Sequence, residues 1–226
     1  IDILTEIHCH SRRSMIKAVF PFNLLTRRAK YDLGAGYIER STTRNDDYER
    51  ARFEVPGHRW VDISEPNYGI VVLNNGKYGH SCDGSTYSLT LLRSPIFPDF
   101  FADEGYQKFT YSIYLRGNKE LYTNYKEVEE IEDKLVLYEG KVLYEPPFEI
   151  EDKNFKVLSY KKGEKTGNIL RISEISGFSG ILSINGGFSK CFLTDNLEEK
   201  TKEIFVEKGV IKYGYKPFEL ITFLIE

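Results

Sequence analysis

Short runs in which apolar and polar residues alternate follow one another along most of the chain. In "QKFTYSIYL", for example, Phe109, Tyr111, Ile113 and Leu115 occupy every second position. Alternation with a period of two is typical of a strand with one buried face. Turn-forming pairs such as Asn75-Gly76 and Asp83-Gly84 separate such runs, and both pairs predict hairpin turns. The polar segment "TTRNDDYER" has no periodicity and predicts a loop. We count roughly a dozen strands and at most one short helix, which predicts an all-β sandwich assembly.

Composition supports a sheet protein and excludes some partners. The chain has 16 Tyr and 15 Phe but one Trp, and aromatic residues suit pleated, half-buried surfaces. Its 31 basic and 34 acidic residues give a net charge of −3, which argues against a nucleic-acid partner. No apolar stretch approaches membrane-spanning length. Cys9, Cys82 and Cys191 are odd in number and far apart, so we expect reduced thiols in a cytoplasmic protein.

The chain divides into three parts by composition. Residues 1–116 carry strand-like runs and predict a large β-sandwich region. Residues 117–165 are charge-dense and predict a connection with room for one short helix, because Leu121, Tyr125, Val128 and Ile131 lie near helical spacing. Residues 166–226 return to strands and predict a smaller C-terminal β-sandwich. The first strand begins at residue 1, and we expect the chain to be part of something longer.

One loop combines an arginine with clustered acids. In "LLRSPIFPDFFADEG", Arg93 ends an apolar strand, and Asp99, Asp103 and Glu104 follow within a short stretch. Glycosidases use a pair of carboxylates, one as acid or base and one as nucleophile. Arginine can also clamp hydroxyl groups through its forked donors. The alternative is a structural ion-pair cluster, which is the favoured interpretation from composition alone.

The histidines give a weaker signal. His8 and His10 flank Cys9, and alternate residues of a strand share a face, so both imidazoles could converge on one metal ion. No further ligand motif completes such a site, and a polar strand face is the simpler interpretation. His58 and His80 are isolated and are expected to be structural or surface residues. No nucleophile elbow, dinucleotide fingerprint or phosphate-binding loop occurs.

Three segments in order resemble a known family. "YIERSTTRN", "ARFEVPGHRWVDISEPNYGIVVLNNGKYG" and "LLRSPIFPDFFADEGYQKFTYSIY" are similar to the C-terminal β region of glycoside hydrolase family 38 α-mannosidases, of the cytosolic, class C type. The similarity runs from about Arg27 to Leu115, with a fainter echo in "KPFELITFLI". Where that family usually has "ERPTH.N", this chain has Ser41 and Thr43 in place of proline and histidine. It also has Asn75 where Asp is common.

The resemblance implies a non-catalytic role for this chain. It implies a galactose-mutarotase-like supersandwich followed by a smaller β-sandwich, packed on an N-terminal catalytic domain and inactive without it. That domain holds the nucleophilic aspartate and a zinc ion, which this chain does not bind, and cleaves terminal α-mannosides with retention of configuration. Arg93 is expected to line the substrate cleft, and Asp99 to orient Arg93 or its loop. Association into a homo-oligomer is also implied, and membrane attachment is not.

Two other functions remain open at this point. The chain could be a free-standing carbohydrate-binding module in which Trp60 or surface tyrosines stack on sugars. It could also be an enzyme in its own right, with Asp99, Asp103 or Glu104 as the carboxylates. The sequence leaves open which α-mannoside the parent enzyme cleaves, with glycan fragments and mannosylglycerate among the choices.

Overall fold

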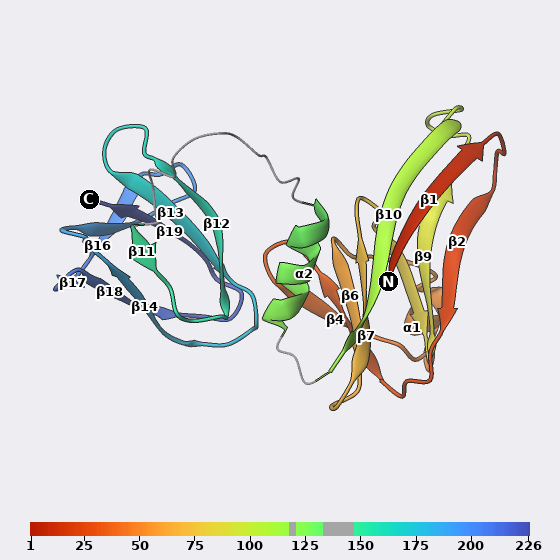
Figure 1. Cartoon of the computed structure of the whole chain (residues 1–226), viewed down its shortest axis with the longest axis horizontal. Helices are drawn as coiled ribbons and strands as arrows, with labels where there is room; N and C mark the ends of the chain where they lie inside the picture. Colours follow the sequence, from red (N-terminus) through yellow and green to blue (C-terminus); the bar gives the residue numbers. More distant parts are fainter. Residues whose placement is uncertain (118–120, 133–146) are drawn as a thin grey trace. The chain divides into compact units, whose positions relative to one another are not determined.

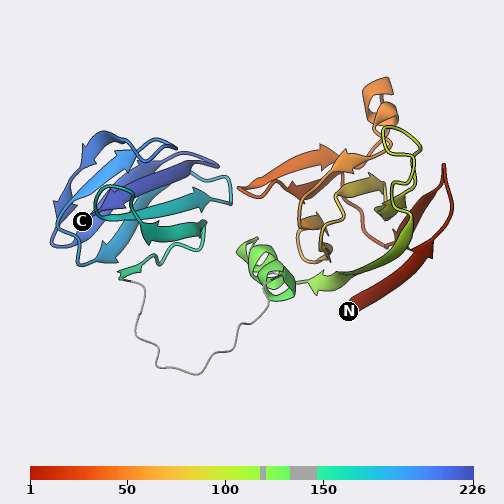
Figure 2. The same cartoon turned by 90° about the horizontal axis from the view of Figure 1, so that it is seen from above.

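The computed structural model describes residues 1–117, 121–132 and 147–226, and it divides the chain into two compact units, Ile1–Lys134 and Leu135–Glu226. Each unit is built mainly from antiparallel strands (Figures 1 and 2). The prediction of an all-β protein with a larger sandwich followed by a smaller one is therefore confirmed. The strands are more numerous than the predicted dozen, because several short runs pair as separate strands.

The first unit contains a sheet of six strands and a sheet of four strands. The six-stranded sheet consists, in spatial order, of β1 (Asp2–Cys9), β10 (Gly105–Arg116), β7 (Gly69–Asn74), β6 (Trp60–Ser64), β3 (Arg28–Asp32) and β4 (Tyr37–Ser41). The four-stranded sheet consists of β2 (Met15–Pro21), β9 (Thr86–Arg93), β8 (Gly79–Asp83) and β5 (Val55–Pro56).

The core of the first unit joins these two sheets. Its buried members include Tyr31, Val61 and Val72 from the larger sheet and Tyr87 and Leu89 from the smaller one. Burial of large apolar side chains between two sheets is the main stabilising term of a sandwich. The alternation predicted for residues 107–115 is confirmed as far as Ile113, since Phe109 and Tyr111 belong to this core and Ile113 packs against it, whereas Leu115 is exposed.

Helix α2 (Tyr122–Glu132) contacts β6 and β7, and Figure 1 shows it beside these strands. Tyr125 and Val128 are buried, as their helical spacing predicts. Asp62 on β6 accepts hydrogen bonds from Asn124 Nδ2 at 2.9 Å and Arg116 Nη1 at 2.7 Å. This buried polar network fixes the helix against the sheet. The predicted connection of residues 117–165 includes α2, and its last residues form strands of the second unit, whereas residues 118–120 and 133–146 lie outside the described part of the chain.

The second unit is also a sandwich of two sheets. One sheet consists of β11 (Phe148–Glu149), β14 (Gly180–Gly186), β18 (Val210–Tyr215) and β17 (Val206–Glu207). The other consists of β12 (Phe155–Lys162), β13 (Asn168–Glu174), β19 (Leu220–Ile225), β15 (Cys191–Thr194) and β16 (Lys200–Ile204). Leu170, Leu182, Ile211 and Phe223 are fully buried members of its core.

Two local predictions differ from the structure. The segment "TTRNDDYER", predicted as a loop, overlaps helix α1 (Asp47–Ala51), which projects at the edge of the first unit (orange in Figure 2). Asp46 caps this helix by accepting a 2.7 Å hydrogen bond from the N–H of Glu49. The Asn75-Gly76 turn does not close a hairpin, because β7 and β8 lie in different sheets. The predicted hairpin at Asp83-Gly84 is confirmed by the pairing of β8 with β9.

Candidate functional site

Arg93 lies at the carboxyl end of β9, opposite Met15 of β2. Its side chain is exposed. Its backbone N–H donates a 2.8 Å hydrogen bond to Oδ2 of Asp103. The loop that leaves the strand therefore returns to it, and an acid of the predicted cluster holds the end of β9.

The loop of residues 94–104 is held at both of its ends. Ser94 exchanges two backbone hydrogen bonds with the turn before β2, accepting from Arg13 N at 2.7 Å and donating to Ser14 O at 2.9 Å. Near the other end, Glu104 forms an ion pair of 3.4 Å with Arg12, whose guanidinium also lies over the ring of Phe100. The loop is thus tied to the turn between β1 and β2 as well as to β9.

The three acids of the loop have three different partners. Asp99 Oδ1 accepts a 2.9 Å hydrogen bond from the N–H of Phe101 within the loop itself. Asp103 accepts from Arg93, and Glu104 pairs with Arg12. Each carboxylate is engaged by a group that fixes the loop. This arrangement supports the structural interpretation of the acids over a catalytic pair within the loop.

A groove of about 390 Å³ lies beside the end of β9. We call it the β9 groove, and the polar residues among those lining it are Glu54, Lys77, Tyr78, Thr90, Arg93 and Asp103. Of the two residues predicted to form the substrate site, Arg93 lines the groove, whereas Asp99 is not among its lining residues. The structure therefore places Arg93 and Asp103 together at the groove. Asp99 instead forms its hydrogen bond within the loop.

Opposite charges are distributed through the β9 groove. Glu54 forms an ion pair of 2.7 Å with Lys17 and also accepts a hydrogen bond from the Thr90 hydroxyl. Burial tends to raise the pKa of Glu54, but the hydrogen bonds from Lys17 and Thr90 outweigh it, so the pKa is lowered. Glu54 is therefore ionised at neutral pH. A general acid of a glycosidase needs a raised pKa, so Glu54 does not fit that role.

Lys77 contributes a positive charge to the β9 groove. Burial lowers its pKa, and the negative charge of Asp103 opposes that effect. Its ammonium group lies 4.1 Å from the centre of the Phe109 ring, at a distance where a cation is attracted to an aromatic face. The groove thus offers charged donors and acceptors that can bind hydroxyl groups.

The histidines are placed as structural groups. His80 is fully buried and hydrogen-bonds the Tyr87 hydroxyl at 2.7 Å. His58 lies beside Asp32 and Tyr78. The rings of His8 and His10 lie close together, with their centres 4.3 Å apart. Over the described residues, no group of three or more His, Cys, Asp or Glu side chains gathers in a way that could hold a metal ion.

Trp60 cannot serve as a sugar platform on this surface. Its side chain is 0 % exposed and packs edge-on against Tyr125 of α2. A stacking residue must present its face to solvent. The role given to Trp60 in the carbohydrate-binding alternative is therefore wrong, and its aromatic surface serves to dock α2. Exposed tyrosines do occur, among them Tyr78 at the β9 groove.

Ser41 and Thr43, which depart from the family pattern, have a structural role. Their hydroxyl groups lie 2.7 Å apart, and Thr43 Oγ1 donates a 3.0 Å hydrogen bond to Glu49 of α1. The two hydroxyl groups thus fix the approach of the chain to α1. These departures lie outside the β9 groove.

Three charged residues of this site were not singled out from the sequence. Three different parts of the chain supply them: Lys17 lies on β2, Glu54 directly precedes β5, and Lys77 lies in the turn after β7. Only the fold brings them to β9. A signal existed for Glu54, since it is a charged residue within "ARFEVPGHRWVD", one of the segments that carry the family resemblance. No comparable signal marks Lys17 or Lys77.

Solved structures define the class to which this architecture belongs. An alpha-mannosidase from Enterococcus faecalis V583 superposes with a TM-score of 0.81 at 17% identity, covering 100% of this chain and 27% of that chain. A glycosyl hydrolase family 38 protein from Enterococcus faecalis gives 0.74 at 19% identity, covering 100% of this chain and 28% of that one. At these identities the likeness establishes the fold, that of a two-sandwich portion within larger chains.

Sequence comparison finds one family model that is similar to part of the first unit. Residues 1–101 match the family model described as "Glycosyl hydrolases family 38 C-terminal domain". The match covers less than half of the chain, and it agrees with the resemblance drawn from the sequence. The matched residues include Arg93 and Asp99.

Curated relatives agree with this resemblance. Alpha-mannosidase 2C1 is 42% identical over 109 residues in Mus musculus and 43% identical over 109 residues in Homo sapiens. Alpha-mannosidase G of Dictyostelium discoideum is 40% identical over 114 residues. These matches cover 48 to 50% of this chain, and the chain spans only about 10% of the length of each relative. Two matches named 2C1 agree with the predicted class C type.

Proposed function

We propose that this chain is the non-catalytic C-terminal β-sandwich portion of a zinc-dependent, retaining α-mannosidase that hydrolyses terminal α-mannosides. In this proposal the chain packs on an N-terminal catalytic domain, and the β9 groove borders the cleft of that domain. The observation that carries the proposal is the match of residues 1–101 to the family 38 C-terminal domain, together with relatives named as alpha-mannosidases.

The chemistry is assigned to residues outside this chain. Retaining glycosidases need a nucleophilic carboxylate and an acid–base group a few ångströms apart. In the loop of residues 94–104, each carboxylate is engaged by its own structural partner. A zinc ion would supply binding and polarisation of sugar hydroxyls when held by His and Asp ligands, but the described residues offer no such ligand set. These observations support a catalytic domain elsewhere in the parent enzyme.

Arg93 is proposed to line the cleft, and Asp99 to orient the loop that follows it. The exposed side chain of Arg93 at the groove supports the first role. The hydrogen bond from Phe101 N to Asp99 supports the second, because it fixes the turn of the loop. Asp103 is added to the proposal as the residue that positions the backbone of Arg93.

A free-standing carbohydrate-binding module is the second candidate. The observation that favours it is the exposed Tyr78 at a groove lined with charged groups, since aromatic faces and hydrogen-bonding groups together bind sugars. Titration of the chain with mannose oligosaccharides separates the two functions. A module binds them without any catalytic domain, whereas a cleft-bordering portion does not.

The proposal is tested first by reconstitution. The chain is assayed with added zinc for hydrolysis of a chromogenic α-mannoside, alone and together with the upstream segment of its parent enzyme. Turnover only in the combined sample is the expected result. Turnover by the chain alone would overturn the proposal and make Asp99, Asp103 and Glu104 the first residues to substitute.

The role of Arg93 is tested in the parent enzyme. Arg93→Ala is expected to lower kcat/KM about 10-fold or more, because a charged hydrogen bond to a substrate hydroxyl contributes about 1.5–3 kcal/mol. The matched control is Arg50→Ala, whose exposed partner is Asp47 on α1. Unchanged kinetics in Arg93→Ala would remove the residue from the cleft while leaving the proposed family function intact.

We also propose a cytoplasmic location for the parent enzyme. Cys9, Cys82 and Cys191 are free thiols, which agrees with a reducing compartment. In the described part of the chain, no helix is long and apolar enough to cross a membrane. Association of the parent enzyme into a homo-oligomer remains an expectation from the family resemblance.

A further inference from the structure

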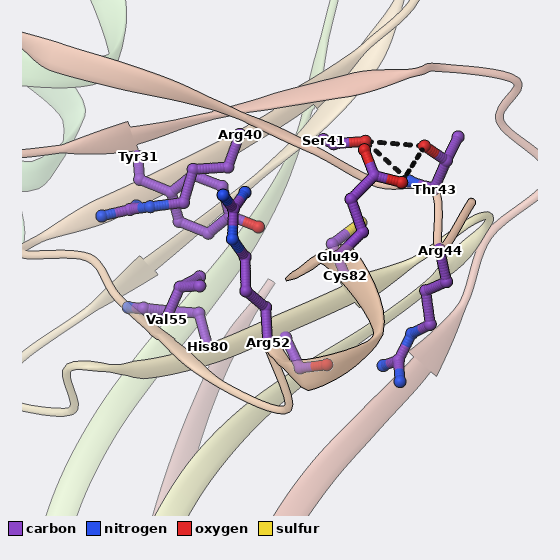
Figure 3. A pocket seen from close by; sticks show the side chains of 11 residues that line it. Tyr31, Arg40, Ser41, Thr43, Arg44, Glu49, Arg52, Val55, His80 and Cys82 are labelled. Carbon is purple, nitrogen blue, oxygen red and sulfur yellow. Dashed lines mark hydrogen bonds between the residues drawn. The ribbon is translucent and has the colours of Figure 1, made fainter. Parts of the chain in front are cut away.

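A small polar pocket lies between the end of β4, helix α1 and strand β8 (Figure 3). The residues that line the pocket include two arginines, Arg40 and Arg52. Tyr31, Glu49 and His80 also line it. The pocket has a volume of about 20 Å³. That is room for about one water-sized group, which excludes a sugar ring.

Arg40 carries a buried donor without a partner. Its guanidinium lies over the Tyr31 ring, 4.7 Å from the ring centre, and its Nη1 atom is buried with no hydrogen-bond partner. Leaving a charged donor unsatisfied in the interior costs free energy, so such groups in native proteins usually have a protein, water or ligand partner. Nη1 of Arg40 therefore marks a position where an acceptor is missing from the fold itself.

A second arginine adds its charge to the same place. Arg52 is the C-cap residue of α1. Burial lowers the pKa of Arg40, and the nearby positive charge of Arg52 lowers it further. Within the part of the chain that the structure describes, neither guanidinium forms an ion pair with a carboxylate. Two positive charges thus lie close together, and neither is paired directly with a carboxylate.

The other charged and titratable groups of the pocket have partners of their own, although the pKa of Glu49, lowered mainly by its hydrogen bond from Asn45, is also lowered by the nearby charge of Arg52. Glu49 is turned toward Ser41 and Thr43 (Figure 3), where it accepts hydrogen bonds from Thr43 Oγ1 at 3.0 Å and from the N–H of Asn45 at 2.8 Å. Arg44 is paired with Asp83 at 3.0 Å. Burial lowers the pKa of His80 to about 4, so its imidazole is neutral at neutral pH.

We propose that Arg40 and Arg52 form a binding site for one small oxyanion, a carboxylate or a phosphate group. Guanidinium groups bind such anions through charge-assisted hydrogen bonds, and a planar anion matches their forked donors. The small volume means that terminal oxygens of the anion enter the pocket, while the rest of its carrier stays at the mouth. The site is independent of the proposed function, because it uses no residue of the β9 groove other than Val55.

The test measures the melting temperature of the 226-residue chain with increasing inorganic phosphate, against chloride at matched ionic strength and pH 7. A ligand that binds the folded state alone raises the melting temperature, and at concentrations well above Kd the expected rise is about 3 °C or more. Arg40→Gln and Arg52→Gln are expected to lose this phosphate-specific rise. Arg44→Gln is the matched control, since it removes a neighbouring arginine that already has a partner.

The test does not depend on whether Arg40→Gln folds. Arg52 is exposed, so Arg52→Gln is expected to fold, and calorimetric titration of phosphate into the unmodified chain gives a direct measurement. Absence of a phosphate-specific rise and of binding heat in the unmodified chain would overturn the proposal. An equal rise in Arg40→Gln, Arg52→Gln and Arg44→Gln would also overturn it, because the anion would then act elsewhere.

The same titration distinguishes two sources of the oxyanion. It is repeated with the chain joined to the upstream segment of its parent enzyme. If phosphate still gives its arginine-dependent effect, the site serves a free anion. If the effect is present in the isolated chain and lost on joining, an acidic side chain of the upstream segment occupies the site. Either result supports an oxyanion site, and neither depends on mannosidase activity.

Discussion

The backbone N–H of Arg93 and the Oδ2 atom of Asp103 are joined by a hydrogen bond of 2.8 Å that closes the loop after β9. Asp103 has a φ of 60°, in the left-handed region, and Gly105 follows with a φ of 101°. The chain thus turns sharply at Asp103, and the carboxylate of Asp103 reaches the end of β9. Because of this contact, the position of the Arg93 backbone depends on one side chain of the loop.

Asp103→Ala is expected to lower the free energy of unfolding by about 2 kcal/mol, since it removes the acceptor of Arg93 N–H and places alanine in the left-handed region. Asp103→Asn keeps an amide oxygen as acceptor, and asparagine tolerates that conformation, so a change within about 0.5 kcal/mol is expected. Urea denaturation followed by Trp60 fluorescence measures both. Equal destabilisation by the two variants would show that the negative charge, and not the hydrogen bond, matters.

A second prediction concerns the network that fixes α2. Asp62 is 2 % exposed and accepts from Arg116, Asn124 and the Ser64 hydroxyl. Asp62→Ala is expected to destabilise the chain by about 3 kcal/mol, because it removes a buried charge from a hydrogen-bonded network. The matched control is Asp47→Ala in an exposed pair with Arg50, for which a change below about 0.5 kcal/mol is expected.

The Asp62 measurement uses the same denaturation assay. Trp60 packs on Tyr125 of α2, so its emission is also expected to shift in Asp62→Ala if the helix loosens. An Asp62 variant as stable as the Asp47 variant would mean that the network does not hold α2 on the sheet.

The sequence predicted strands well and strand partners less well. The alternation of residues 107–115 and the Asp83-Gly84 turn identified β10 and the β8–β9 hairpin, because both signals are local. Asn75-Gly76 gave the same kind of signal, yet β7 pairs with β6 and β10, and β8 pairs with β9 and β5. A turn signal predicts where the chain bends. Which strands pair depends instead on which distant strands can bury each other's apolar faces.

The site shows the same limit. Arg93 was identified because it ends an apolar strand before an acidic loop, a pattern visible in one stretch of sequence. Glu54 and Lys17 lie far away along the chain and meet only through the pairing of β2 with β9 and the packing of the residue before β5. Helix α1 was missed although Asp46, three residues before Glu49, is a recognisable helix-start signal.

A third prediction concerns the second unit. Glu174 is fully buried and accepts three backbone hydrogen bonds, from Ser176 N at 2.8 Å, Gly177 N at 2.9 Å and Phe218 N at 2.7 Å. Glu174→Gln turns one accepting oxygen into a donor that faces N–H groups, so a loss of about 2 kcal/mol is expected. Hydrogen exchange of the β13 and β19 amides is expected to accelerate accordingly.

The control for Glu174 is Glu203→Gln, an exposed residue of β16. It is expected to leave amide exchange in β13 and β19 unchanged. If Glu174→Gln behaves in the same way, the buried carboxylate does not stabilise the turn between β13 and β14 or the start of β19.

The last prediction concerns pH. Burial lowers the pKa of His80 from its ordinary value of 6.5 to about 4, although its contact with Gly57 opposes the shift. The unfolded chain therefore binds a proton that the folded chain does not bind between these two values. Stability attributable to His80 is constant above about pH 6.5, falls as pH decreases toward 4 and levels off below it, by about 3 kcal/mol in total.

The measurement compares urea denaturation at pH 7 and pH 4.5 for the unmodified chain and His80→Gln. Glutamine does not titrate, so the variant is expected to lose less stability on acidification, whatever its stability at pH 7. His10→Gln, at an exposed position after β1, is the matched histidine control. If His80→Gln and the unmodified chain lose equal stability, protonation of other groups, and not of the buried imidazole beside Tyr87, governs the acid sensitivity of the first unit.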